Sequence, residues 1–438
     1  MTVFVDDATL RDARARAARL PLGPVEQQRW QDVAAYGAAR RPDPTAERAA
    51  MLRGLLDQPA ADDLGVFEAA SRLLADEVTG SAAAPDRARE VHRLCLQWFG
   101  EDFTEAAPLL GLFTGHHRDP EGGPSQADPE LVRKLAQWLA PRAGDGDGAR
   151  IEDVSVIPGG FSRLMLDLRW TGGRGVVRVE QDGMFATEGR REVAVMRILR
   201  ARGYPVPAVL WEETDPHVLG HPFFVMEHVP GQARTDDEGI DDVLRVIARL
   251  HGLGAETVDQ IAALDGLAAG ASAEQVIEAQ LRYWHGVYRS AVDYPIPLLE
   301  RGFAWLRANL RATGPPVVVH GDPGPGNALQ SDRGVTAVID WELAHAGDAA
   351  EDWAYLALIR GRRLGSPPSW KARLAATVGV EYDEPTWRAW EAFNSVKGAC
   401  VNLTGLDVFR RSARPTPDLL AIAVGVHLRF LGRVVELT

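Results

Sequence analysis

The chain has 438 residues, a formal net charge of −13 and a hydrophobic content of 46%. This length predicts two or three domains, and the ordinary balance of apolar and charged residues predicts a globular protein. Because the chain is acidic and has no long run of lysine or arginine, neither nucleic acid nor an anionic membrane is an expected partner.

The sequence carries no sign of export or of membrane insertion. The first twenty residues contain several charged side chains, beginning at Asp6, and no apolar stretch approaches the length of a membrane span. The two cysteines, Cys95 and Cys400, lie far apart and have no metal-ligand spacing. We therefore expect a cytoplasmic protein with reduced, buried thiols.

Residues 1–140 are expected to form a helical accessory domain. Apolar residues recur at intervals of three and four over 66–78 and 91–98, and Asp128-Pro129 opens a further amphipathic helix that ends near Leu139. This region holds no catalytic constellation, and its helices are a candidate surface for a homodimer. Residues 141–150, rich in glycine and aspartate, are the expected linker.

Residues 151–230 read as a small, strand-rich lobe. Three antiparallel strands are expected over 151–157, 164–168 and 176–179. Between the first two lies the turn Pro158-Gly159-Gly160-Phe161-Ser162, whose glycines would let backbone amides approach an anion closely. An ordinary hairpin loop would have the same sequence, so this turn alone does not decide between the two interpretations.

Three further features of this lobe fit a nucleotide site. Arg178 on the third strand would lie beside the α- and β-phosphates, and Glu192 on a helix over 187–202 would hold that cation in place. A plain surface ion pair is the alternative. The strand ending at Met226-Glu227-His228 passes into a turn whose backbone could hydrogen-bond an adenine edge, although Met226 could equally be a core residue.

Residues 231–438 form the expected C-terminal lobe, which is mainly helical. Helical periodicity covers 241–251, 275–289, 303–310, 348–359, 386–403 and 419–435. His251 is expected to be a hydrogen-bonded histidine at a helix end rather than a catalytic one. The aromatic residues of 275–289 could hold an organic acceptor or pack in the core.

The stretch from Val317 to Asp340 concentrates the polar residues of a phosphoryl-transfer site. A β-branched run leads to Asp322, Asn327 follows five positions later, and a second apolar run delivers Asp340. Transfer of a γ-phosphoryl group needs a carboxylate near the acceptor hydroxyl and oxygen ligands for Mg²⁺. These three residues supply that set.

The pattern His320-Gly-Asp322, four residues, Asn327, followed by Ile339-Asp340-Trp341-Glu342, resembles the aminoglycoside phosphotransferase family of kinase-like enzymes over residues 150–438. Within it, the chain looks most like the phosphotransferase domains associated with acyl-CoA dehydrogenases. The residues that support this subgroup are Gly159-Gly160-Phe161-Ser162, Arg191-Glu192-Val193, Tyr204-Pro205-Val206-Pro207, Pro222-Phe223-Phe224-Val225-Met226-Glu227 and Asp340-Trp341-Glu342-Leu343-Ala344.

The resemblance implies an α+β, protein-kinase-like bilobal fold, with a small β-rich lobe and a mainly helical lobe behind the helical accessory domain. It implies ATP, or GTP in its place, as the phosphoryl donor, with Mg²⁺ as the metal. Asp322 matches the catalytic aspartate, and Asn327 and Asp340 match the metal ligands. Arg178 stands where relatives have a phosphate-binding lysine, with Glu192 as its partner, and Asp352 matches a residue that supports the catalytic loop.

Two departures from the family pattern concern positive charge. An arginine replaces the lysine at position 178, and the residues between Asp322 and Asn327 include two prolines but no basic side chain. The predicted function is phosphorylation of a small-molecule hydroxyl on a metabolite, a hydroxyacyl or hydroxyacyl-CoA, or an antibiotic. The alternatives are phosphorylation followed by elimination at the same ATP site, and a non-catalytic nucleotide-binding scaffold.

Overall fold

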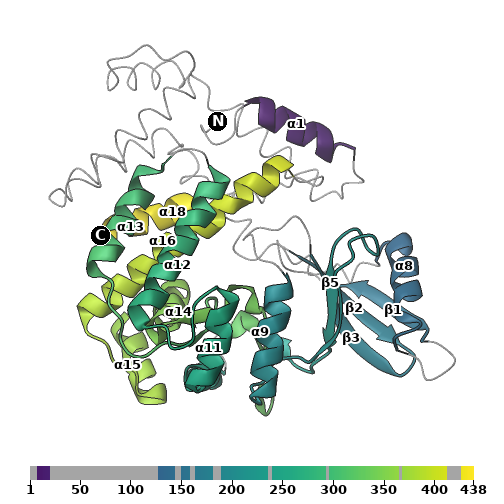
Figure 1. Ribbon diagram of the computed structural model, residues 1–438, viewed down its shortest axis with the longest axis horizontal. Coiled ribbons are helices and arrows are strands. Elements are labelled where there is room, and N and C mark those ends of the chain that lie inside the picture. The colour runs from purple at the N-terminus through teal and green to yellow at the C-terminus, as the bar shows by residue number, and fades with distance from the viewer. Residues whose placement is uncertain are drawn as a thin grey trace. The chain divides into compact units, whose positions relative to one another are not determined.

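The computed structural model describes residues 7–19, 127–143, 149–157, 163–180, 189–234, 239–292, 295–364, 367–411 and 426–438. The chain divides into two compact units, one of residues 1–116, 281–310 and 392–438, the other of residues 117–280 and 311–391. Figure 1 shows both units. Cys95 and the turn with Gly159, Gly160 and Ser162 lie outside the described residues. So does most of the expected accessory domain, of which the structure describes residues 7–19, with α1 (Asp7–Ala17), and residues 127–140.

The second unit contains a five-stranded antiparallel sheet that confirms the expected strands. In sheet order the strands are β1 (Ile151–Val156), β2 (Arg163–Trp170), β3 (Gly173–Glu180), β5 (Phe223–Glu227) and β4 (Val209–Glu213). Arg178 pairs across β3 with Met165 on one side and Phe224 on the other. Because side chains alternate along a strand, Arg178 points to one face of the sheet while Val177 and Val179 point to the other.

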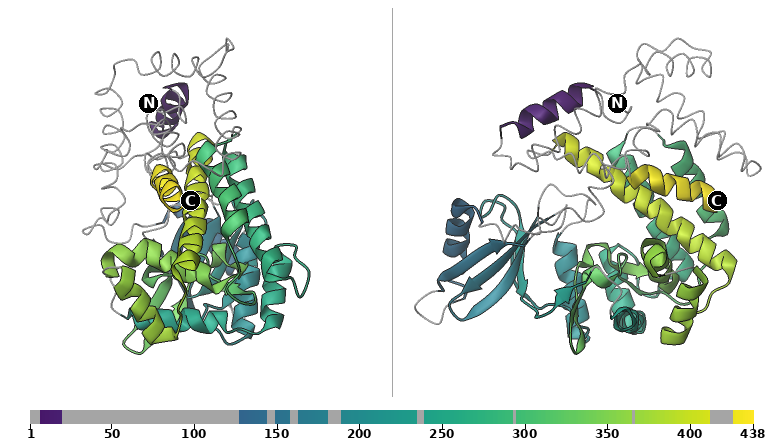
Figure 2. Two further views of the ribbon diagram at one scale, coloured as in Figure 1. Left: turned by 90° about the vertical axis from the view of Figure 1, so that its left-hand side faces the viewer. Right: turned by 180° about the vertical axis from the view of Figure 1, so that it is seen from behind.

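Helix α9 (Gly189–Ala201) covers the face of the sheet to which Arg178 points. Its residues Val193, Met196 and Leu199 share a core with Phe224 and Met226. Figure 1 and the second view in Figure 2 show α9 and α8 on opposite sides of the sheet. The sheet therefore forms the middle layer of three.

Helix α8 (Pro129–Leu139) covers the other face of the sheet. It begins where the sequence predicted, because the Asp128 carboxylate accepts the backbone N–H of Glu130 and caps the helix. Trp138 lies edge-on to Phe223 with ring centroids 4.8 Å apart, and its Nε1 donates to Glu213 at 2.7 Å. The linker expected at 141–150 remains a prediction, while the helix that precedes it packs on this sheet.

The rest of the second unit combines helices with two small sheets. The helices are α10 (Ile240–His251), α11 (Ala255–Leu264), α14 (Ala349–Leu364) and α15 (Pro367–Val378). One sheet has the order β6 (Gln232–Ala233), β8 (Ala328–Ser331), β9 (Gly334–Val338), and the other pairs β7 (Val317–Val319) with β10 (His345–Gly347). The sequence reasoning missed α11, α15, β6 and β10.

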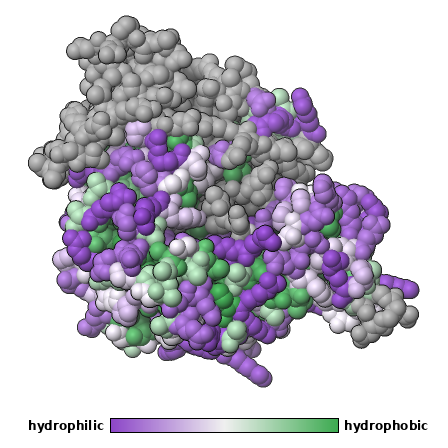
Figure 3. Space-filling view, in the orientation of Figure 1, coloured by the Kyte–Doolittle hydropathy of each residue, from purple (hydrophilic) through white to green (hydrophobic). Residues whose placement is uncertain are grey.

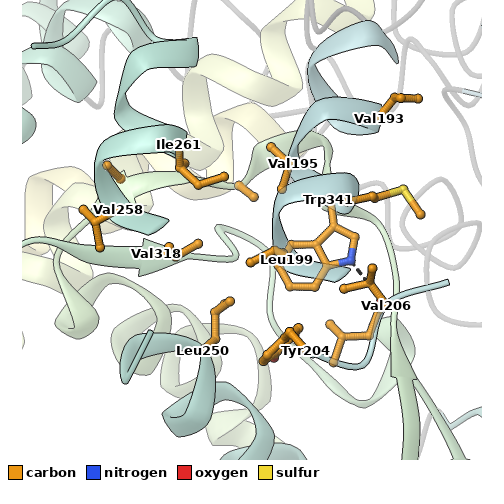
Figure 4. Packing of buried hydrophobic residues seen from close by; sticks show 14 of the residues in the cluster. Val193, Val195, Leu199, Tyr204, Val206, Leu250, Val258, Ile261, Val318 and Trp341 are labelled. Atoms are coloured by element: carbon orange, nitrogen blue, oxygen red, sulfur yellow. Dashed lines mark hydrogen bonds between the residues drawn. The ribbon is translucent and has the colours of Figure 1, made fainter. Parts of the chain in front are cut away.

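The core of this unit is built around Trp341, which is fully buried. Figure 4 shows its ring among Leu199, Tyr204 and Val206, and its Nε1 donates to the carbonyl oxygen of Val338 at 2.9 Å. The indole thereby satisfies its only donor inside the core. This packing fixes the residue directly after Asp340.

The first unit is helical in the part that the structure describes. Helix α13 (Pro297–Asn309) lies with α18 (His427–Leu437) and with parts of α12 (Ala273–Ala291) and α16 (Glu384–Arg411). A Cβ on Gly302 would come within 3.0 Å of Val396 and Val434, so α13 approaches both neighbours closely. Tyr288 is fully buried and stacks on Phe303, which places part of the aromatic segment in the core, and Cys400 is also buried.

The described surface is mainly hydrophilic on the face in Figure 3, where hydrophobic residues occupy smaller areas between purple ones. Among the helices that the structure describes, none has the length and apolar content needed to cross a membrane.

Candidate active site

The loop that carries Asp322 begins at the end of β7 and depends on a glycine. Gly321 has φ +83°, and a Cβ there would come 2.6 Å from the carbonyl oxygen of Leu343. Glycine is required on both counts. The half-buried Asp322 follows, and its backbone N–H donates to His320 Nδ1 at 3.2 Å.

The carboxylate of Asp352, on α14, holds this loop from behind. Its two oxygens accept the backbone N–H groups of His320 at 3.0 Å and Gly321 at 2.9 Å, and His251 Nε2 lies 2.9 Å from it. Burial alone would raise the pKa of Asp352, but these hydrogen bonds outweigh burial and hold the pKa below its usual value. Asp352 therefore supports the loop, as the resemblance implied, and His251 is a hydrogen-bonded histidine at the end of its helix, as expected.

Asn327 lies against Asp322 at the end of the short turn η1 (Pro325–Asn327). Its Nδ2 donates to the backbone oxygen of Asp322 at 2.8 Å and to Oδ2 of the same residue at 3.1 Å. The amide nitrogen is occupied by these two bonds. The Asn327 Oδ1 is thus the atom that would serve as an oxygen ligand.

Asp340 is tied to the same loop and has an unusual backbone. The Ile339 N–H donates to the backbone oxygen of Asn327 at 2.9 Å, so the residue before Asp340 is bonded directly to the loop of Asp322. Asp340 itself has φ 68° and ψ 63°, the left-handed region that few residues other than glycine, asparagine and aspartate adopt. Its side chain remains one-third exposed.

Asn327 and Asp340 fit a magnesium ion better than a metal that takes many protein ligands. Within the described ranges, no group of three or more His, Cys, Asp or Glu side chains could hold a metal. Asn327 and Asp340 would supply two oxygen atoms, and Mg²⁺ characteristically takes one or two protein oxygens together with water and substrate phosphates.

Arg178 joins Asp340 to a buried cluster of charges. Its Nη2 lies 3.1 Å from a carboxylate oxygen of each of Glu192, Asp340 and Glu342. Arg178 is 6% exposed and Glu192 is 2% exposed, so their pair is not a surface ion pair. Burial opposes the charge on Arg178, but the three carboxylates outweigh it and raise its pKa, while burial raises the pKa of Glu192.

A second arginine belongs to this cluster. Arg163, the first residue of β2, donates from Nη2 to Glu342 Oε2 at 3.1 Å, and both side chains are buried. Burial, together with the charge of Asp340, raises the pKa of Glu342 to about 7. Sequence reasoning assigned no role to either residue. The available signals were the position of Arg163 directly after the glycine turn and that of Glu342 two residues after Asp340.

Comparison with known proteins identifies the family of the chain. The model of the family described as "Phosphotransferase enzyme family" matches residues 153–393, more than half of the chain, and this range contains every residue of the candidate active site described above. The chain belongs to this phosphotransferase family. Membership supports a small-molecule phosphotransferase, in agreement with the resemblance found in the sequence.

Relatives of the chain include larger proteins. The chain is 32% identical over 181 residues to acyl-CoA dehydrogenase family member 10 of Mus musculus, a match that covers 38% of this chain and 16% of the relative. A match to family member 11 of Homo sapiens is 30% identical and covers 39% of this chain and 23% of the relative. The chain thus spans less than a quarter of the length of these relatives.

A solved structure shares the fold of the chain. The crystal structure of LicA in complex with AMP has a TM-score of 0.50 at 13% identity, and the match covers 71% of this chain and 100% of LicA. At this identity the likeness shows the fold alone. The expected mixture of helices with an antiparallel sheet is confirmed for the described residues, whereas the all-helical accessory domain remains a prediction.

Met226 and Glu227, which the sequence placed near adenine, make packing and hydrogen-bond contacts within the protein. Met226 is packed in the core. The Glu227 side chain accepts the Ala208 N–H at 3.1 Å and pairs with Arg200 at 3.2 Å, and its own N–H donates to the Ala208 oxygen. His228 follows directly after β5. A role for this segment in adenine binding therefore depends on its remaining backbone groups and stays a prediction.

Proposed function

We propose that this protein transfers the γ-phosphoryl group of ATP to a hydroxyl group of a small molecule. The observation that carries the proposal is the joining of Asp322, Asn327, Asp340 and Arg178 by direct hydrogen bonds within one compact unit. Asp322 and Asn327 share hydrogen bonds, the backbone joins Asn327 to the strand of Asp340, and Arg178 binds Asp340. Phosphoryl transfer depends mainly on such positioning and on charge stabilisation.

In this proposal Asp322 orients the acceptor hydroxyl and takes its proton as the new oxygen–phosphorus bond forms. The bond from the γ-phosphorus to the bridging oxygen breaks, and that oxygen leaves with ADP. The hydrogen bonds from Asn327 hold the Asp322 carboxylate in place, and Arg178 contacts the phosphates of the nucleotide. Bound Mg²⁺, held by Asn327 and Asp340, would offset the negative charge of the phosphate oxygens.

For the acceptor we propose a hydroxyacyl or hydroxyacyl-CoA compound. The support is the similarity to acyl-CoA dehydrogenase family members 10 and 11, whose names point to acyl-CoA chemistry. The structural relatives include macrolide and spectinomycin phosphotransferases, so antibiotics are the comparison group for the test.

The test is an ATP-consumption assay across hydroxyacyl-CoAs, aminoglycosides, macrolides and nucleosides, with the mass of every product recorded. We expect the hydroxyacyl-CoAs to yield ADP and a product heavier by one phosphate. Free phosphate with an unsaturated product would instead indicate phosphorylation followed by elimination. GTP in place of ATP tests the choice of donor.

The matched variant is Asp322→Asn, which keeps the size of the side chain but removes the proton acceptor. We expect turnover to fall by about 10²–10⁴-fold, the usual contribution of a general base. Full turnover in the folded variant would contradict the assignment of Asp322. Tight binding of ATP without turnover on any acceptor would favour a non-catalytic scaffold.

A further inference from the structure

The buried cluster around Arg178 contains one oxygen atom that two arginines share. Glu342 Oε2 accepts from Arg163 Nη2 at 3.1 Å, and Arg178 Nη2 lies 3.1 Å from the same oxygen. Arg163 is 8% exposed and Glu342 is 7% exposed, so water screens this contact poorly. The start of β2 is thereby joined to the residue that lies two positions after Asp340.

The charges of the cluster show why one arginine is insufficient. Three carboxylates, those of Glu192, Asp340 and Glu342, lie 3.1 Å from one nitrogen of Arg178. That nitrogen carries two hydrogens and cannot donate to three carboxylates at once. Removing one partner of a buried ion pair leaves the charge of the other partner uncompensated. Without Arg163, Arg178 would have to balance the negative charge of Glu342 in addition to those of Glu192 and Asp340.

We infer that Arg163 is a positioning residue for nucleotide binding: its guanidinium neutralises Glu342, so that Arg178 is not drawn toward Glu342 and keeps its orientation for the nucleotide phosphates. The inference rests on the proposed function and adds to it a residue that does not itself touch the phosphates. Arg163 supplies the second cation that compensates for the three carboxylates. It also ties the strand that follows residues 158–162 to the loop of Asp340.

This role predicts a specific pattern among variants. Arg163→Met should weaken nucleotide binding by about tenfold, in the range of residues that act through a coupled network. Arg163→Lys should have a nucleotide affinity between those of the wild type and Arg163→Met, since an ammonium keeps the charge but not the planar fork of donors. Arg163→Met combined with Glu342→Leu should recover binding to within about threefold of the wild type, because both members of the buried pair are removed together.

The experiment is titration of the full chain with ADP and with ATP plus Mg²⁺, by calorimetry, alongside thermal unfolding of each variant. Arg174→Met is the matched control, because Arg174 also donates from Nε and Nη2 to one carboxylate, that of Asp167, but is 43% exposed in its side chain. We expect this control to bind nucleotide within about twofold of the wild type. A purely structural Arg163 would lower the melting temperature without changing nucleotide affinity in the folded variants.

Each outcome decides the inference. Nucleotide affinity unchanged in Arg163→Met, or a double variant that binds no better than Arg163→Met, would overturn it. If Arg163→Met does not fold, Arg163→Lys and the double variant decide in the same way. If the wild type binds nucleotide and only the Arg163 pattern fails, the proposed function stands. If the wild type binds neither ADP nor ATP, both proposals fail.

Discussion

The loop of Asp322 and the cluster around Arg178 both belong to the candidate active site, but different interactions hold them in place. In the loop, a buried carboxylate and a close glycine turn fix the backbone, since Asp352 accepts the N–H groups of His320 and Gly321. In the cluster, charged side chains from distant parts of the chain balance one another around Arg178. The contacts of the loop therefore fix the position of Asp322, and those of the cluster balance the charge of Arg178. Variants that affect one without the other can separate these contributions.

Among the variants that compare the two regions, the largest effect is expected where the regions meet, at Asp340. Asp340→Asn keeps a residue that tolerates the left-handed backbone but weakens both metal binding and the contact with Arg178. We expect turnover to fall by about 100-fold or more. Steady-state rates at several Mg²⁺ concentrations measure this change. Asp332→Asn, on the exposed β8–β9 turn, is the control, and an equal loss there would show that the effect is not specific to the site.

A variant of Trp138 tests whether α8, on the face of the sheet opposite to Arg178, helps to hold the cluster in place. Trp138→Ala would remove an aromatic side chain packed against Phe223 and Trp211, and we expect a loss of about 3–4 kcal/mol in the free energy of unfolding. Denaturant unfolding measures the loss, and nucleotide affinity should fall with it. Leu210→Ala, at a side chain exposed on β4, should change stability little. Equal effects of the two variants would show that α8 does not support the sheet.

Asp352 tests the loop without touching the cluster. Asp352→Asn would replace a buried carboxylate that accepts two backbone N–H groups and contacts His251. We expect the free energy of unfolding to fall by about 2 kcal/mol, together with a lower kcat at nearly unchanged nucleotide affinity. Asp259→Asn is the matched control, because Asp259 accepts the backbone N–H of Gly270 at the surface. Loss of nucleotide affinity in Asp352→Asn with unchanged kcat would contradict the separation of the two regions.

His427, in the helical unit, is a buried titratable group that lies outside the cluster around Arg178. Burial lowers its pKa from 6.5 to about 4, so the folded state disfavours the charged form that the unfolded chain takes up readily. Stability contributed by neutral His427 is fully present above pH 6.5 and is lost as the pH falls toward 4. The expected loss between pH 7 and pH 5 is about 2 kcal/mol.

Denaturant unfolding at both pH values measures this loss, and His427→Gln should remove it. His217→Gln, at an exposed position in the β4–β5 turn, is the matched control for the histidine-to-glutamine change itself. A pH dependence unchanged in His427→Gln would show that another group is responsible.

The sequence predicted the loop far better than the cluster, for a physical reason. Asp322, Asn327 and Asp340 lie within 19 positions, so a short pattern of strands and polar residues brings them together. Arg163 and Glu342 are 179 positions apart, and only the packing of the sheet against the loop makes them neighbours. The same limit applies to α8, whose helix and cap were predicted from local residues but whose packing partner was not.

The missed elements are short or weakly patterned. The strands β6 and β10 have two and three residues, too few for a visible alternation of polar and apolar side chains. The interpretation of Met226 also depended on packing, because a methionine near an expected adenine site and a methionine in the core have the same sequence.

The backbone of Asp340 restricts what evolution can do at this position. Only aspartate, asparagine and glycine adopt its left-handed conformation at low cost, and of these only aspartate supplies a carboxylate. A relative that has lost catalysis but kept the fold should therefore carry asparagine or glycine here. The identity of this one residue offers a way to separate enzymes from nucleotide-binding relatives before any protein is made.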